Sequence, residues 1–245
     1  MRARQGRDVG RVATPGVLLR VKLWRTGPPS HKASGCSLAK SVEAALNAGV
    51  KSAFKEWAVV VDALGRGDQI LILRKGGISE GRGGFQIDHE QFWLFPTLFH
   101  QQAESVILPA GVGHSLLETL RSDPSKLPVQ YLARVHAWTR LSSLKSALSL
   151  RGQHIWKEEV ISQRFDWGRD QSIAALLVRI YRVPEPILLP LMPSYGGCKS
   201  WIEFEVDLPT REAEPVLSDA VFQKRVDAAN RALTPSGGDA FETVC

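Results

Sequence analysis

Residues Gln69-Ile70-Leu71-Ile72-Leu73-Arg74 form a short segment that is apolar on both of its alternating faces. A run of this length is typical of a strand that other elements cover on both sides. We therefore expect a central strand of a sheet here. The basic turn that follows it, Lys75-Gly76-Gly77-Ile78, marks the place where the chain leaves the sheet.

The segment before this strand predicts a helix. Ser52 can cap a helix that spans Ala53–Leu64, and Gly65 can end it. The apolar residues of one face recur at helical spacing, and they are Phe54, Trp57, Ala58, Val61 and Leu64.

The rest of the chain predicts further strands and helices. Phe92–Phe95 predicts an aromatic strand that Pro96 stops, and Thr97–Gln102 predicts a helical turn. We then expect a helix at Gly113–Arg121, a strand at Val129–Leu141, helices at Ser142–Ser149 and Ile155–Gln163, a strand at Ile173–Val183 ended by prolines 184, 186, 190 and 193, an outer strand at Cys198–Val206 and a helix at Val216–Leu233. This order predicts the α+β class, a single mixed domain with a small mixed or antiparallel sheet packed by helices.

The predicted core domain occupies residues 51–208, and residues 209–245 add a C-terminal helix and tail to it. Residues 1–50 differ in composition. Up to Gly49, nine Lys and Arg face two acidic residues, a net charge of +7, while the other 22 basic and 23 acidic residues contribute −1 to the total of +6. We expect a disordered basic extension here. It suits a nucleic-acid arm or a transit segment, or it lies outside the working protein if translation starts at the valine codon of Val50, as bacterial translation can.

Length and composition exclude several classes of protein. The chain has 245 residues, of which 44% are hydrophobic and 23% charged, so it can form a core and is neither fibrous nor a coiled coil. No apolar run approaches the ~18 residues of a membrane span. The cysteines, Cys36, Cys198 and Cys245, include no CxxC pair. We expect a cytoplasmic protein without a membrane partner or a bound metal, and the sequence identifies no cofactor.

The turn Arg74-Lys75-Gly76-Gly77 is the strongest candidate for a binding site. Paired glycines allow positive φ and a close backbone approach, so consecutive N–H groups can surround an anion while the two cations add countercharge. Phosphate is the natural guest, although the turn has neither the Walker pattern nor a dinucleotide fingerprint. The structural alternative is a tight turn with solvated charges. We expect Lys55, His100 and Gln101 to join this site.

Four residues in the same part of the chain are catalytic candidates. Glu56 or Glu80 together with His89 or His100 can perform acid–base chemistry, and two carboxylates can hold a hard metal ion. A nuclease of the PD-(D/E)xK kind, however, needs an acidic residue where Leu73 stands. The alternatives are an exposed helix face for Glu56 and partly buried imidazoles for the two histidines.

Several stretches together carry a family resemblance. They are Ala53–Val60, Leu73–Ile78 with Glu80, Phe92–Thr97 with His100 and Gln101, Arg179–Arg182, Gly197–Trp201 and Pro215–Asp219 with Phe222. In wording and order they resemble family 1802 of the bacterial domains of unknown function, from about Lys51 to Leu233. The resemblance implies a stand-alone bacterial cytoplasmic protein with no assigned activity, and residues before Val50 lie outside it.

Three functions stay open. The first is a domain that binds a phosphate-bearing ligand, nucleic acid or nucleotide, at the Arg-Lys-Gly-Gly anion site; small RNA-binding folds of the PUA and ASCH type expose a basic loop at a strand end in this way. The near-neutral charge after residue 49 argues against it. The second is a non-catalytic interaction or regulatory domain, and the third is a metal-dependent, nuclease-like hydrolase. Ligand binding predicts convergence on one pocket of Lys55 or Glu56, Arg74, Lys75, His89 and His100.

Overall fold

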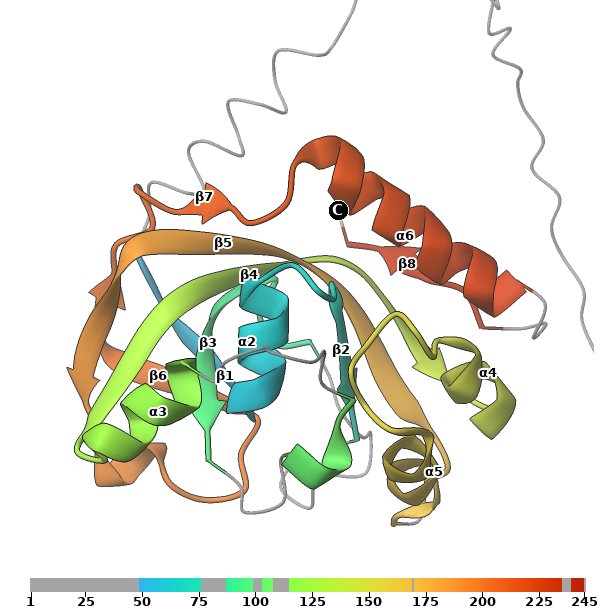
Figure 1. Cartoon of the computed structure of the whole chain (residues 1–245), viewed down its shortest axis with the longest axis horizontal. Coiled ribbons are helices and arrows are strands. Elements are labelled where there is room, and N and C mark those ends of the chain that lie inside the picture. Colours follow the sequence, from blue (N-terminus) through green and yellow to red (C-terminus); the bar gives the residue numbers. More distant parts are fainter. Residues whose placement is uncertain are drawn as a thin grey trace, which may run out of the picture.

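One curved sheet organises the part of the chain that the structure describes (Figure 1). The computed structural model describes residues 49–75, 87–98, 103–107, 115–168, 170–234 and 239–244. Eight strands in these ranges form the sheet. They are β1 (Val50–Trp57), β2 (Leu71–Arg74), β3 (Gln91–Thr97), β4 (Lys126–Leu141), β5 (Ile173–Pro190), β6 (Trp201–Leu208), β7 (Glu214–Pro215) and β8 (Glu242–Thr243).

The sheet is mixed. Its strand order is β2-β5-β4-β3-β1-β6, with β7 added to β5 and β8 added to β4. β1 and β3 run parallel, and the other pairs are antiparallel. The long β4–β5 pair therefore lies near the middle, while β2 and β6 stand at opposite ends of the strand order.

Helices pack against both sides of this sheet (Figure 1). α2 (Ala58–Gly65) lies under the curve of the sheet, and all its residues are buried. α6 (Asp219–Leu233) lies across the opposite side of β5 and buries Phe222 and Val226. The other helices are α3 (Ser115–Ser122), α4 (Leu144–Ser149) and α5 (Glu158–Asp166), with short 3-10 turns at Ala103–Ser105 and Pro193–Tyr195. The expected α+β class is confirmed, and no helix in the described ranges has the length and apolar character to cross a membrane.

The predicted helix Ala53–Leu64 is wrong in its first part. Val50–Trp57 is strand β1, and the helix starts only at Ala58. β1 pairs with β3 on one side and with β6 on the other. Helical spacing of the apolar residues could not exclude a strand, because residues 53–56 are buried on both faces and such a strand shows no polar alternation.

Three other predictions about strands need correction. β2 is a buried strand as expected, but it stands at one end of the strand order and not at its centre. β3 continues through Pro96 to Thr97. β5 continues through Pro184 and Pro186, so these two prolines do not end it, and Pro190 is its last residue.

The remaining elements agree with the sequence to within a few residues. α3, β4, α4, the first part of β5, the outer strand β6 and α6 are confirmed, and α5 begins at Glu158, later than expected. Most of the helical turn expected at 97–102 falls on residues 99–102, outside the described ranges. Residues 1–48 also lie outside them, so the basic extension and the domain bounds stay predictions.

Candidate functional site

The two ends of the strand order meet at one side-chain contact. Arg74, the last residue of β2, donates from Nε (3.2 Å) and Nη2 (2.8 Å) to Oγ of Ser200, the residue before β6. The N–H of Lys55 in β1 donates to the Ser200 carbonyl (2.9 Å). The sheet therefore approaches closure here. We call this place the seam, and it comprises Arg74 and Ser200 with Lys55, Glu56 and Arg164 around them.

Glu56 is the acidic residue of the seam, and only 2% of it is exposed. Its Oε1 accepts a hydrogen bond from the N–H of Trp57 (2.7 Å), whereas Oε2 has no hydrogen-bond partner among the described residues. Burial raises the pKa of this carboxyl because it penalises the charged form, and the charges of Arg74 and Arg164 oppose the rise. A buried carboxylate oxygen without a partner is costly, which is typical of a group that serves a site.

Arg164 of α5 brings a second guanidinium to the seam. Its guanidinium carbon lies 3.7 Å from the centre of the Trp156 ring and 5.2 Å from that of Trp57. Burial lowers its pKa to about 10, while Glu56 raises it and Arg74 lowers it further. The two indole rings pack against each other in a T-shaped arrangement, with ring centres 4.8 Å apart. Contact with both rings restricts the orientation of the guanidinium, so its charge acts on the seam from a defined position.

Two more buried polar atoms near Arg164 have no hydrogen-bond partner in the described part of the chain. They are Nε2 of His154 and Nε1 of Trp156. Burial, and then the charge of Arg164, lowers the pKa of His154 to about 4, so its imidazole is neutral at pH 7. Buried polar groups are normally hydrogen-bonded. Three such atoms around one guanidinium, with Oε2 of Glu56 as the third, therefore indicate a polar site.

Lys55 is a buried cation of the seam. Its ammonium donates to the carbonyl oxygens of Gly196 (3.3 Å) and Gly197 (3.1 Å) in the loop before β6. Burial is the main cause of its lowered pKa; Cys198 opposes this effect, and the charges of Lys199 and Arg74 add to it. The ammonium therefore lies within the electrostatic reach of two further cations.

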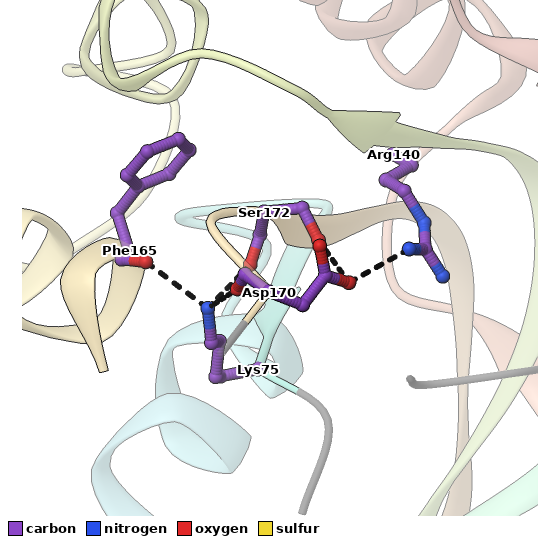
Figure 2. Close-up of polar contacts among 5 residues, drawn as sticks. All are labelled: Lys75, Arg140, Phe165, Asp170 and Ser172. Atoms are coloured by element: carbon purple, nitrogen blue, oxygen red, sulfur yellow. Dashed lines mark hydrogen bonds and ion pairs between the residues drawn. The ribbon is translucent and has the colours of Figure 1, made fainter. Parts of the chain in front are cut away.

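Backbone carbonyl oxygens surround the ammonium of Lys75 (Figure 2), so its environment differs from that of Arg74. Its ammonium donates to the backbone carbonyl oxygens of Phe165 (3.0 Å), Ser172 (3.1 Å) and Asp170. An ammonium has three donor protons, so these three carbonyls can use all of them. Lys75 thereby ties the end of β2 to the end of α5. Its predicted part in ligand binding stays a prediction.

The structure describes some of the other predicted site residues and not the rest. Lys55, Glu56 and Arg74 do come together. His89 lies against the edge of Trp201, with ring centres 5.3 Å apart, and Trp201 in turn contacts Phe54. The predicted roles of the remaining residues stay predictions because those residues lie outside the described ranges: Gly76, Gly77, Glu80, His100 and Gln101.

Sequence reasoning missed Arg164 and Ser200. Arg164 carried a weak signal, because it follows the buried Ile161 by three residues and so belongs to the apolar face of α5. An arginine in that position indicates a buried or stacked guanidinium. Ser200 carried no local signal, because Arg74, its partner, is 126 residues away in the chain.

A family model matches residues 53–228, with the seam inside that range. The chain belongs to the family described as a domain of unknown function (DUF1802). The family resemblance noted in the sequence is thereby confirmed. No curated protein matches this DUF1802 chain.

Crystal structures of ASCH from Zymomonas mobilis and of two of its mutants are similar to the DUF1802 chain. Each shares 13% sequence identity with it at a TM-score of 0.37. The alignments cover 72% of this chain and 93%, 94% and 96% of those chains. A TM-score this low establishes neither a common fold nor a common function.

Proposed function

We propose that this DUF1802 domain binds a phosphate-bearing ligand, a nucleic acid or a nucleotide, at the seam, with Arg74 as the cation that contacts the phosphate. The observation that carries the proposal is the excess of positive charge around Arg74. The charge of Arg74 lowers the pKa of both Lys55 and Arg164, and the charge of Lys199 lowers the pKa of Lys55. Glu56 is the acidic group that acts on Arg164 in return.

The electrostatics of the seam favour an anionic guest. Burial is the main cause that lowers the pKa of both Lys55 and Arg164; the nearby cations lower it further, while Cys198 opposes the change for Lys55 and Glu56 opposes it for Arg164. Glu56 can offset one positive charge at most, and its burial favours the neutral carboxyl. A phosphate group carries one or two negative charges and several acceptor oxygens, so it would offset the remaining charge where a neutral ligand would not.

Arg74 is suited to this contact by its geometry. The Ser200 hydroxyl engages two of the five guanidinium N–H donors, which leaves three without an acceptor in the described part of the chain. The Phe54 ring supports the guanidinium, 5.3 Å from ring centre to guanidinium carbon. A guanidinium held in this way can present two parallel donors to phosphate oxygens.

Titration calorimetry with pyrophosphate, AMP and a single-stranded RNA octamer tests the proposal. We expect Arg74→Met to weaken pyrophosphate binding at least about tenfold, because a hydrogen bond to a charged group contributes roughly 1.5–3 kcal/mol. Arg231→Met, an exposed change on α6, serves as the matched control and should leave binding unchanged. A steeper salt dependence for RNA than for AMP would identify nucleic acid as the ligand.

Two outcomes contradict the proposal. One is equal pyrophosphate affinity in the wild type and Arg74→Met. The other is no binding of any of the three compounds, which would favour a non-catalytic interaction domain. Within the described ranges, no group of three or more His, Cys, Asp and Glu residues able to hold a metal ion occurs; Glu80 and His100, two candidates for a metal-dependent hydrolase, lie outside those ranges.

A further inference from the structure

Lys55, a member of the seam, also lines a cleft of about 580 Å³ whose lining includes none of the other seam residues. Its walls come from β1, β3, the start of β4, α3 and the loop between β5 and β6. This volume is within the range of roughly 300–1,000 Å³ that is typical of small-molecule sites.

The cleft is lined mainly by apolar side chains. Phe95, Leu127 and Tyr195 are buried members of the lining. Leu98 and Leu191 also line it, and they are 49% and 48% exposed. Covering exposed apolar surface is favourable in water, so a ligand with an apolar body would gain free energy mainly at Leu98 and Leu191.

Two charged residues occur among those that line the cleft, and their environments differ. Lys126 is exposed and pairs with Asp123 at 3.2 Å. Lys55 is 9% exposed, and its ammonium spends two of its three donors on the carbonyls of Gly196 and Gly197. The third donor has no acceptor within the described part of the chain. The cleft therefore offers one buried positive charge with one unused donor.

We propose that this cleft binds a small amphipathic monocarboxylate of the medium-chain fatty acid type. Its carboxylate pairs with the Lys55 ammonium, and its chain packs against Leu98 and Leu191. One buried cation matches one negative charge. An apolar lining would leave the polar groups of a ribose or a second phosphate without partners. The ligand thus differs from that of the seam, so this inference goes beyond the phosphate-binding proposal.

Calorimetry of the full chain with octanoate and with 1-octanol tests the inference. Both probes share the apolar chain, and octanoate alone carries the charge. We expect octanoate to bind the wild type at least about tenfold more tightly than octanol. In Lys55→Met the two probes should bind with equal affinity, while in Lys126→Met, the matched control at the rim, the difference should be kept.

A second pair of variants tests the apolar contact without touching a buried residue. Leu98→Asp places a carboxylate on the exposed rim and should weaken the binding of both probes about tenfold or more. Val206→Asp, an equally exposed position on β6 outside the cleft, should weaken neither. Because both positions are exposed, both variants should keep the wild-type thermal unfolding temperature.

The outcomes separate this inference from the proposed function. Equal affinity of the wild type for octanoate and octanol would overturn the carboxylate assignment. No binding of either probe, or equal weakening by Leu98→Asp and Val206→Asp, would overturn the cleft as a ligand site. Arg74→Met should lose pyrophosphate binding yet keep octanoate binding, so the failure of one proposal leaves the other standing.

Discussion

Glu56 lies beside two guanidinium groups, and even so burial raises its pKa above the ordinary value of 4.5. The folded protein therefore holds this proton more tightly than the unfolded chain does. As the pH rises from 4.5 through the folded-state pKa, the unfolded chain ionises first and stability is lost. Below pH 4.5 both states are protonated, so this loss is absent there.

Replacement of Glu56 by glutamine tests both the direction of this pH dependence and the effect of the Glu56 charge on anion binding at the seam. We expect Glu56→Gln to unfold at a higher urea concentration than the wild type at pH 8 and at a similar one at pH 4. At pH 8 it should also bind pyrophosphate more tightly, roughly threefold to tenfold, because a like charge is removed from the site. Glu159→Gln, an exposed change on α5, is the control for both measurements. Unchanged pyrophosphate affinity in Glu56→Gln would contradict a negatively charged Glu56 beside the bound anion.

The seam also indicates how far single residues can be interpreted from sequence. Arg74 and Lys75 are adjacent cations after a buried strand, so the sequence predicts the same role for both. Their environments differ because the three carbonyls around Lys75 come from residues 165–172, about ninety positions later in the chain. No local pattern carries that information. The apolar face of α5 indicates a buried or stacked Arg164, but it does not identify Trp156 as the ring in contact.

At the scale of elements, Lys75 connects β2 to α5, and its replacement should affect stability more than binding. We expect Lys75→Met to lower the free energy of unfolding by about 1–3 kcal/mol, because the hydrogen bonds of a charged donor to partly buried carbonyls are lost. Pyrophosphate affinity should stay within about twofold of the wild type. Urea denaturation and calorimetry measure the two effects, with Lys224→Met on α6 as an exposed control. A loss of affinity like that of Arg74→Met would instead assign Lys75 to the anion site.

Strand boundaries were the least predictable feature of the elements. Proline usually ends a strand because it lacks an N–H for the ladder. In β5, however, the pairing with β4 passes from Arg182 opposite Tyr131 to Ile187 opposite Val129. Pro184 and Pro186 fall within this bulge, where the ladder needs no N–H from them. The strand can therefore continue, and sequence alone cannot locate a bulge that depends on its partner strand.

At the scale of the whole molecule, the sequence predicts the class of fold and the family but not the closure of the sheet. The apolar runs and turns are local, and they suffice for an α+β domain with most of its elements. The seam depends on β2 and β6, which stand at opposite ends of the strand order, and on one contact between Arg74 and Ser200. Net charge is equally uninformative about the site, because the basic excess of the sequence lies before residue 50 whereas the cations of the seam are brought together by folding.

This closure predicts that a ligand at the seam couples the two ends of the sheet. Arg74 is the last residue of β2, and its hydrogen-bond partner Ser200 immediately precedes β6. We therefore expect saturating pyrophosphate to slow amide hydrogen exchange in β2 and in β6 of the wild type, because both strands are held by one bound anion. In Ser200→Ala, pyrophosphate should still slow exchange in β2 but slow it less in β6, because Arg74 then has no hydroxyl before β6 to which it can donate. α6, on the opposite side of the sheet, provides the internal control and should exchange at the same rate with and without ligand. Exchange measured by mass spectrometry that slows in α6, or in β2 alone in the wild type, would contradict an anion bound across the seam.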